Sequence, residues 1–222
     1  MSGTRKHESS RGPSPLPPGK PAIPPPKPAI SPPVGSLKAG VNVPAAPAKP
    51  ASASTSVHKA SAESETCKFS IFTISDTRTI QDDESGKVAI EVLTKFGHSP
   101  VDHRIIKNER RLIEAAITGA VAGEAELVVT VGGTGISKKD LTIEAIRPIL
   151  WKEMPGFGEL FRANSAKEIG TAAIMSRALL GVTEKLKLVC ALPGSPDGVR
   201  LALAGILAYE LKHILWELRR YK

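Results

Sequence analysis

The chain has 222 residues and a formal net charge of +8 at pH 7, and its length suits one domain of typical size plus an appendage. Residues 1–66 hold eight Lys or Arg against three Asp or Glu, so most of the positive charge lies in this segment. Because the rest of the chain is only slightly basic and aromatic residues make up 4%, we expect no dedicated nucleic-acid binding.

The sequence carries no sign of a membrane segment or of a disulfide framework. No apolar run approaches the about 18 residues that span a bilayer, and the N-terminus lacks the apolar stretch of a signal peptide. Cys67 and Cys190 lie far apart, and neither belongs to a C-x-x-C pair. We therefore expect a cytoplasmic protein without contact to a membrane, in which both cysteines are reduced and fill small apolar spaces.

The first 66 residues differ from the rest in composition. Fourteen of the nineteen prolines precede residue 51, and the remainder of the segment is mostly Ala, Ser, Lys and Gly. Such a segment buries too little apolar surface to offset its ordering entropy, so we predict disorder with polyproline II character. Lys20-Pro21-Ala22-Ile23 recurs as Lys27-Pro28-Ala29-Ile30. The repeat could dock into an aromatic groove of a partner, but a solvated spacer is the favoured interpretation.

From Cys67 onward, strand-like and helix-like patterns alternate. Short runs rich in β-branched and apolar residues predict strands at 69–74, 101–106, 127–131 and 186–192. Apolar residues at helical spacing predict helices at 86–96, 109–122 and 197–218, with a further helix that begins near 140–142. This alternation predicts βαβ units, and thus a doubly wound α/β domain over 67–222 with a mainly parallel sheet and helices on both faces.

Two of these helices have recognisable apolar faces. The expected face of the 109–122 helix consists of Leu112, Ala115, Ala116 and Ala120. The expected stripe of the last helix consists of Val199, Leu203, Ile206, Leu207, Ile214 and Leu218. Because this stripe is broad for a single small domain, we expect the protein to self-associate.

In doubly wound sheets, ligands bind in loops at the carboxyl ends of the strands. One such loop is Thr130–Asp140, which holds Gly132, Gly133 and Gly135 around Thr134. Glycines let the backbone approach a ligand closely and direct several N–H groups at an anion, and the following helix adds positive potential. Asp140 could serve only as the cap of that helix, but an acid at the end of a glycine-rich loop favours a ligand site.

Two other strand-end loops are less specific. Ser75 and Asp76 follow the first strand, where they could bind a ligand or cap a turn. Pro193-Gly194-Ser195-Pro196 follows the last strand, and a helix start with Ser195 as its cap explains this turn by itself. The five histidines show no metal-ligand spacing, and no G-x-S-x-G motif supports a serine hydrolase.

Taken together, these loops resemble the MoaB/MogA family of molybdopterin-binding proteins. The matching segments, in the order found in the family, are SDTRTIQDDESG (75–86), TVGGTGISKKDLTIEA (130–145), PGFGELFR (155–162), IMSRA (174–178) and LPGSP (192–196). The resemblance covers residues 68–218. It implies the doubly wound fold, a homotrimer or a homohexamer of two trimers, and the reaction of molybdopterin with ATP to adenylyl-molybdopterin and pyrophosphate.

The resemblance also implies roles for individual residues. Gly132, Gly133, Thr134 and Gly135 would hold ligand phosphate, Asp140 would support catalysis and bind Mg²⁺, and Ser176 would contribute to adenylylation. The remaining residues expected to line the pocket are Ser75, Asp76, Asn108, Pro193, Gly194 and Ser195. Glu159 and Arg162 could contact the pterin, although an ion pair on a helix surface is an equally good interpretation. A downstream metal-insertion protein is the implied recipient of the product.

The sequence departs from the family at one position. Adenylylating members carry a second acid in the loop after the second strand, and here Asn108 stands in its place. Because an amide is a poor Mg²⁺ ligand, a protein that binds and hands over molybdopterin without activating it remains the alternative. A third possibility is another nucleotide-processing reaction, as in CinA-type proteins, although no further folded domain is expected here.

Overall fold

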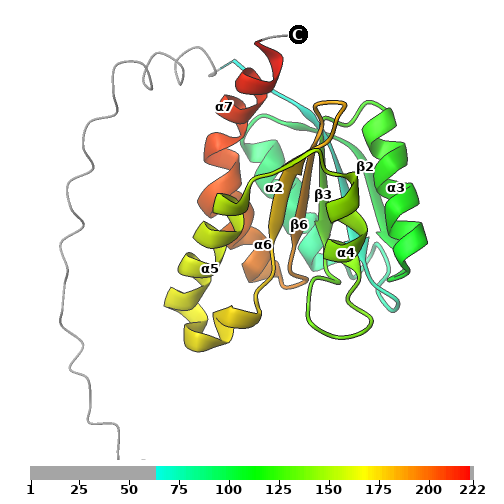
Figure 1. Ribbon diagram of the computed structural model, residues 1–222, viewed down its shortest axis with the longest axis vertical. Helices are drawn as coiled ribbons and strands as arrows, with labels where there is room; N and C mark the ends of the chain where they lie inside the picture. Colours follow the sequence, from blue (N-terminus) through cyan, green and yellow to red (C-terminus); the bar gives the residue numbers. More distant parts are fainter. Residues whose placement is uncertain (1–63, 221–222) are drawn as a thin grey trace, which may run out of the picture. The chain divides into compact units, whose positions relative to one another are not determined.

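The computed structural model describes residues 64–220. The predictions for the proline-rich segment and its K-P-A-I repeat therefore lie outside the described residues. From Ser64 onward the chain forms a six-stranded sheet with helices on either side (Figure 1).

The sheet has the strand order β2-β1-β3-β6-β5-β4. The parallel strands are β1 (Lys68–Ile74), β2 (Ser99–Ile106), β3 (Leu127–Val131) and β6 (Leu188–Leu192). Two antiparallel strands, β5 (Leu179–Val182) and β4 (Lys152–Glu153), complete one edge. The chain runs from β1 outward to β2 and then returns to β3 on the other side of β1. The order thus reverses between β1 and β3, and the predicted doubly wound α/β fold is confirmed.

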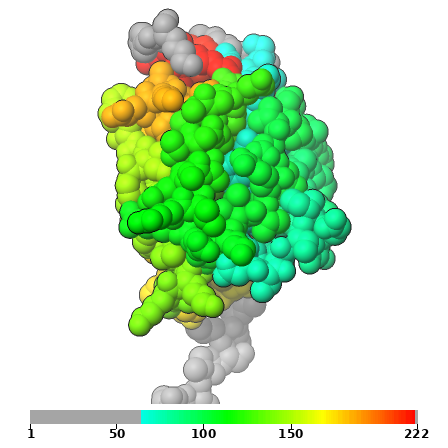
Figure 2. Space-filling view, turned by 90° about the vertical axis from the view of Figure 1, so that its right-hand side faces the viewer, coloured from blue at the N-terminus to red at the C-terminus, as the bar shows by residue number. Residues whose placement is uncertain are grey.

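Helices cover both faces because alternate residues of each buried strand face opposite sides. Phe69 and Ile71 of β1 pack into one apolar cluster, whereas Phe72 and Ile74 pack into the other. The first cluster lies under α2 (Glu84–Lys95), α5 (Pro155–Ile169), α6 (Pro196–Ala202) and α7 (Ala208–Arg219). The second lies under α3 (Arg110–Ala122) and α4 (Thr142–Ile146). Figure 2 shows the side of the molecule on which the green part of the chain, which includes α3, is exposed.

Several element predictions were incomplete. The strands β4 and β5 and the helix α5 were not expected, because the two strands are only two and four residues long and α5 has no regular apolar face. The last strand begins at Leu188 rather than at 186. Leu186 has a φ of 57° and lies in the hairpin turn after β5, where its N–H donates to the Thr183 carbonyl oxygen.

The predicted apolar face of α3 was partly wrong: Ala116 and Ala120 pack partly against the second cluster, but Leu112 and Ala115 are exposed. Its buried residues are Ile113, Ile117 and Val121, whereas Leu112 is 44% exposed. The β-branched side chains at four-residue spacing face the sheet, and Leu112 lies beside them toward solvent.

The last helix uses its apolar stripe within its own domain. It runs from Pro196 to Arg219 through a π-helical turn, η3 (Leu203–Leu207). Val199, Leu203 and Leu207 are buried, and Ile206, Ile214 and Leu218 pack partly against the same cluster. The stripe therefore does not by itself require a second copy, and self-association stays a prediction.

Both cysteines are free and buried, as expected. Burial raises the pKa of the Cys67 thiol to about 12, and that of Cys190 is raised as well. Within residues 64–220 no helix is long and apolar enough to cross a membrane.

The amino ends of the strands are joined by ion pairs. Arg219 of α7 donates to Glu126, which precedes β3, at 2.8 Å, and it also pairs with Glu65. Nearby, Lys68 and Glu124 pair at 2.6 Å on the surface. These contacts tie the last helix and the start of β1 to the central strands.

Candidate functional site

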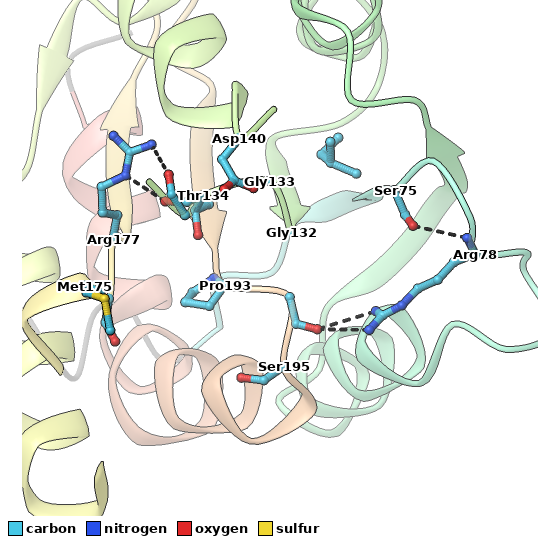
Figure 3. A pocket seen from close by; sticks show the side chains of 14 residues that line it. Ser75, Arg78, Gly132, Gly133, Thr134, Asp140, Met175, Arg177, Pro193 and Ser195 are labelled. Atoms are coloured by element: carbon cyan, nitrogen blue, oxygen red, sulfur yellow. Dashed lines mark hydrogen bonds between the residues drawn. The ribbon is translucent and has the colours of Figure 1, made fainter. Parts of the chain in front are cut away.

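A cleft of about 500 Å³ lies at the carboxyl ends of the central strands. Loops after β1, β3 and β6 meet there with the chain that precedes β5 (Figure 3). The lining residues are Ile74, Ser75, Arg78, Gly132, Gly133, Thr134, Gly135, Asp140, Met175, Ser176, Arg177, Pro193, Gly194 and Ser195. The two glycine-containing loops and the loop after β1 are thus brought together, as the strand-end argument predicts.

The floor of the cleft requires glycine. Gly132 has a φ of 97°, and a Cβ there would lie 2.7 Å from the Ile74 carbonyl oxygen. A Cβ at Gly194 would lie 3.3 Å from the Gly132 Cα. The backbones of three strand ends therefore pack against one another without side chains, which leaves the peptide groups of this floor close to any ligand.

Asp140 lies at the end of the glycine loop and shapes it. Its Oδ2 accepts a hydrogen bond from the Ser137 N–H at 2.9 Å. A Cβ at Gly135 would lie 2.6 Å from the same oxygen, so a larger residue there would displace the carboxylate from its present position. The interpretation of Asp140 as the cap of the next helix is wrong, because the residue before α4 is Leu141 and no side chain caps that helix.

Asn108 and Asp76 join two loops outside the cleft. The Asn108 N–H donates to the Asp76 carboxylate at 2.9 Å, and the Asn108 Oδ1 accepts from the Leu141 N–H at 3.4 Å. Thr142 fixes the same region by donating to the Gly132 carbonyl oxygen at 2.8 Å. The side-chain oxygen of Asn108 is thus engaged with the backbone, and neither Asn108 nor Asp76 lines the cleft.

Arg177 holds the glycine loop from one side. Its guanidinium donates to the carbonyl oxygens of Thr134 at 2.7 Å and Gly135 at 2.8 Å, and it pairs with Glu144 at 2.7 Å. The hydrogen bond from Arg177 lowers the pKa of the Glu144 carboxyl. Two carbonyls and one carboxylate therefore occupy this cation, which fixes the shape of the loop.

Arg78 approaches the cleft from the opposite side (Figure 3). The backbone N–H of Arg78 donates to the Ser75 hydroxyl oxygen at 3.1 Å, and this hydrogen bond closes a turn after β1. Both terminal nitrogens of its guanidinium lie 3.4 Å from the Gly194 carbonyl oxygen. Sequence reasoning did not single out Arg78 or Arg177, although both belong to the matched segments.

The other predicted residues fall into two groups. Ser176 is half-buried in the cleft wall, and Ser195 lies at the start of α6, where its hydroxyl accepts from the Gly198 N–H at 3.2 Å. Glu159 is exposed on α5 and is not among the residues of the cleft. Arg162 lines a neighbouring cavity of about 220 Å³ that shares Arg177 with the cleft. The functional roles of all these residues stay predictions.

A magnesium ion fits this cleft only if ligand phosphates supply most of its shell. Among residues 64–220 no three His, Cys, Asp or Glu side chains are grouped to hold a metal. Asp140 offers one carboxylate, whose Oδ1 accepts no hydrogen bond from the described residues. Mg²⁺ is commonly held by one or two carboxylates together with phosphates and water, so the donor set suits a metal that arrives with a nucleotide.

Comparison with known proteins places this chain in a family. A family model described as a probable molybdopterin binding domain matches residues 70–213. A molybdenum cofactor biosynthesis protein B from Bacillus anthracis is 44% identical over 170 residues, which cover 75% of this chain and 99% of the relative.

Solved structures agree with this match. The crystal structure of a molybdenum cofactor biosynthesis protein B is 42% identical, with a TM-score of 0.68 over 70% of this chain and 98% of the other. The tungsten cofactor synthesizing protein MoaB from Pyrococcus furiosus is 38% identical, with a TM-score of 0.65 over 70% and 98%. The chain therefore belongs to the MoaB/MogA family of molybdopterin-binding domains.

Proposed function

We propose that this protein acts in molybdenum or tungsten cofactor biosynthesis, and that it adenylylates molybdopterin with Mg-ATP. The observation that carries the proposal is the cleft, where a glycine floor, the Asp140 carboxylate and two arginines converge. Such a set suits phosphate-bearing ligands, since backbone N–H groups and a guanidinium with remaining donors, such as that of Arg78, both bind phosphate. The named relatives of this chain are proteins of the same pathway.

The reaction is a displacement at the α-phosphorus of ATP. A phosphate oxygen of molybdopterin forms a bond to that phosphorus, and the bond to the bridging oxygen of the β-phosphate breaks, so that pyrophosphate leaves. No covalent bond to the protein is needed, and catalysis rests on positioning and charge neutralisation. Bound Mg²⁺ would supply charge neutralisation between the phosphates.

Each part of the cleft has a task in this scheme. The glycine floor lets both ligands approach the backbone, and Arg177 keeps the Thr134–Gly135 carbonyls turned away from the phosphates by binding them. Asp140 would hold the metal together with ligand phosphate. Ser176 contributes a hydroxyl donor on the wall beside Arg177.

A handover protein is the second candidate, and Asn108 favours it. Its side-chain oxygen binds the Leu141 N–H, and the position offers an amide where a carboxylate would be needed to hold a metal. Such a protein would bind molybdopterin in the same cleft and pass it to a metal-insertion partner. Assembly into trimers or hexamers and a cytoplasmic location belong to both candidates as predictions.

Pyrophosphate release by the purified protein tests the proposal. We expect release with molybdopterin and Mg-ATP together, and none with either alone. Tight pterin binding without release, combined with release by the Asn108→Asp variant, would identify a handover protein. Release from Mg-ATP without pterin would instead indicate a different nucleotide-processing reaction.

A further inference from the structure

The two arginines of the cleft are held in different ways. Arg177 makes close hydrogen bonds to two carbonyl oxygens and pairs with Glu144. The guanidinium of Arg78 has only long contacts of 3.4 Å, to the Gly194 carbonyl oxygen and the Ser85 hydroxyl. A guanidinium carries five N–H donors, so Arg78 keeps donors for a ligand, whereas Arg177 is largely occupied by the protein.

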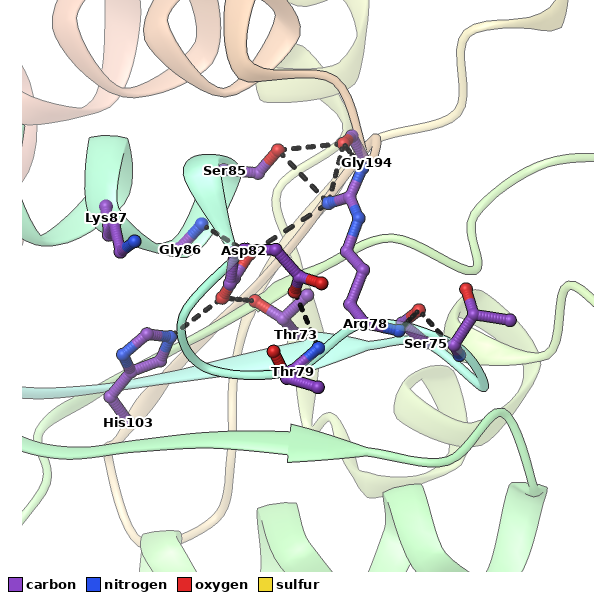
Figure 4. Close-up of polar contacts among 12 residues, drawn as sticks. Thr73, Ser75, Arg78, Thr79, Asp82, Ser85, Gly86, Lys87, His103 and Gly194 are labelled. Atoms are coloured by element: carbon purple, nitrogen blue, oxygen red, sulfur yellow. Dashed lines mark hydrogen bonds and ion pairs between the residues drawn. The ribbon is translucent and has the colours of Figure 1, made fainter.

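Behind Arg78 lies a buried carboxylate, Asp83. It is 0% exposed, and it accepts hydrogen bonds from Thr73 Oγ1 at 2.6 Å and from the Gly86 N–H at 3.0 Å. His103 Nε2 of β2 lies 2.8 Å from Oδ2, the carboxylate oxygen that Thr73 also contacts. Figure 4 shows these donors converging from β1, β2 and the start of α2, with the Arg78 side chain turned toward Gly194 and Ser85.

The charge of Asp83 is more than a helix cap requires. Its Oδ1 caps α2 through Gly86, which a neutral Ser or Thr could also do. Burying a carboxylate is costly unless donors and a cation surround it. Burial raises the pKa of Asp83, but the hydrogen bonds of Thr73, Gly86 and His103, together with the charge of His103, outweigh it and leave that pKa below its usual value.

The cation nearest to this carboxylate on the cleft side is Arg78. Its Nη1 lies 3.9 Å from Asp83 Oδ1, and its guanidinium contacts Gly194, whose backbone packs against Gly132 of the glycine floor. Among the described residues, Asp83 is the one acid within salt-bridge distance of Arg78. The Asp83 carboxylate attracts the Arg78 guanidinium from the side away from the cleft. The N–H donors on the other side of the guanidinium therefore remain available to a ligand in the cleft.

We propose that Arg78 forms an anion-binding position for a ligand phosphate, on the opposite side of the floor from Arg177, and that Asp83 is the positioning residue that holds it there. The position is separate from the glycine loop itself. The inference rests on the proposed function only for the source of the phosphate, which is either the polyphosphate of the nucleotide or the phosphate of the pterin.

A double-mutant cycle on ligand affinity tests this inference. The full chain and its Arg78→Ala, Asp83→Asn and doubly substituted variants are titrated by calorimetry with inorganic pyrophosphate and, separately, with molybdopterin. We expect Arg78→Ala to weaken binding of one of these ligands about tenfold or more, as loss of a charged hydrogen bond does. The ligand that responds identifies the source of the phosphate.

Asp83→Asn is expected to weaken the same binding about fivefold when Arg78 is present and by less than about twofold when it is combined with Arg78→Ala, because coupled sites are not additive. Thr183→Ala is the control, since it removes a buried hydroxyl contact in the β5–β6 turn, far from the cleft. It should lower the melting temperature and leave both affinities unchanged. If Asp83→Asn does not fold, Asp83→Ser, which keeps a side-chain cap for α2 and removes the charge, takes its place in the cycle.

Three results separate the possible failures. Equal losses from Asp83→Asn with and without the Arg78 side chain would overturn the positioning role of Asp83. Unchanged affinity for both ligands in Arg78→Ala would overturn the anion-binding position. The third result is the expected coupling between Arg78 and Asp83 in a protein that releases no pyrophosphate from molybdopterin and Mg-ATP. It would contradict the proposed adenylylation and leave the anion-binding position of Arg78 standing.

Discussion

The two ends of the parallel strands β1, β3 and β6 are built on opposite principles. At the amino ends, side chains close the structure: Arg219 is paired with Glu126 and Glu65. At the carboxyl ends, Gly132 and Gly194 have no side chains, so the backbones of three strand ends pack directly against one another. The same strands are therefore joined by side chains at one end and leave room for a ligand at the other.

The arginines at the two ends show the same contrast. Arg219 is neutralised by two carboxylates, so it stabilises the junction of α7 with the start of β1. Arg78, at the carboxyl ends, has its one acid partner behind it at 3.9 Å. A guanidinium satisfied by the protein contributes to stability, and one that keeps donors free contributes to binding.

The largest expected effect comes from adding a side chain to the floor of the cleft. Gly132→Ala places a Cβ 2.7 Å from the Ile74 carbonyl oxygen at a φ of 97°. We expect a stability loss of about 2 kcal/mol or more and a loss of pyrophosphate release of more than about a hundredfold. Chemical denaturation and the release assay measure the two effects.

Gly119→Ala is the matched control for that change. Gly119 lies in α3 with nothing within 4 Å of its added Cβ, so the same substitution should stabilise the helix by about 0.5–1 kcal/mol. Activity should stay at the wild-type level. Equal damage from both substitutions would show that the floor of the cleft is not special.

Removing the charge of the acid in the cleft is the next largest effect. Asp140→Asn should lower the rate of pyrophosphate release about a hundredfold, the usual cost of losing one electrostatic group from an active site. Glu159→Gln changes an exposed acid outside the cleft, and its rate should not change. Steady-state kinetics of pyrophosphate release measures both variants. A slower Glu159→Gln variant beside an unaffected Asp140→Asn variant would contradict the assignment of Asp140 as the acid of the active site.

At the amino ends, Arg219→Ala should affect stability alone, by about 1 kcal/mol at neutral pH. Burial raises the pKa of Glu126, but the hydrogen bond and charge of Arg219 outweigh it and hold that pKa below 4.5. The stabilisation is therefore complete above that value and is lost as the pH falls through the folded-state pKa. Denaturation curves from pH 3 to 7 should differ between wild type and variant mainly above about pH 4, with catalysis unchanged throughout.

The smallest effect at neutral pH concerns His98. Its Nδ1 accepts from the Cys67 N–H at 3.2 Å, and its buried Nε2 has no partner among the described residues. Burial lowers the pKa of His98, and the charge of Lys212 lowers it further. The neutral ring therefore stabilises the fold fully above the unfolded value of 6.5, and this contribution is lost as the pH falls from there to the folded-state pKa.

His98→Gln should remove that part of the acid sensitivity. The slope of stability against pH just below 6.5 should decrease by up to about 1.4 kcal/mol per unit, the value for one proton. Melting temperatures at pH 5 and 7 measure it. An unchanged slope would mean that another group governs this range.

The sequence predicted the parts of the fold that local patterns determine. The runs 69–74 and 127–131 are rich in apolar residues because helices cover both faces of these strands, and the structure confirms both strands as buried along these runs. The strands β4 and β5 were missed because their pairing depends on residues distant in the chain, with Lys152 opposite Val182. The face of α3 was misassigned because small alanines gave no clear signal beside Ile113 and Ile117.

The same division applies to the cleft. Gly132, Gly194 and Ser75 could be placed together because the carboxyl ends of parallel strands share one edge of the sheet. Arg78 and Arg177 could not be placed, because their partners are backbone oxygens of Gly194 and Thr134, more than forty residues away in sequence. A carbonyl oxygen has no sequence signature, so only the folded structure reveals these contacts.

Hydrogen exchange of the whole chain, with and without molybdopterin and Mg-ATP, tests the central contrast most directly. The carboxyl ends should gain protection on binding, in the segments 75–83, 132–140 and 193–195, while the amino-end segments around Glu126 and Arg219 should not change. Protection confined to other surfaces, such as the groove around Trp151 and Glu184, would contradict the assignment of the cleft as the site of ligand binding.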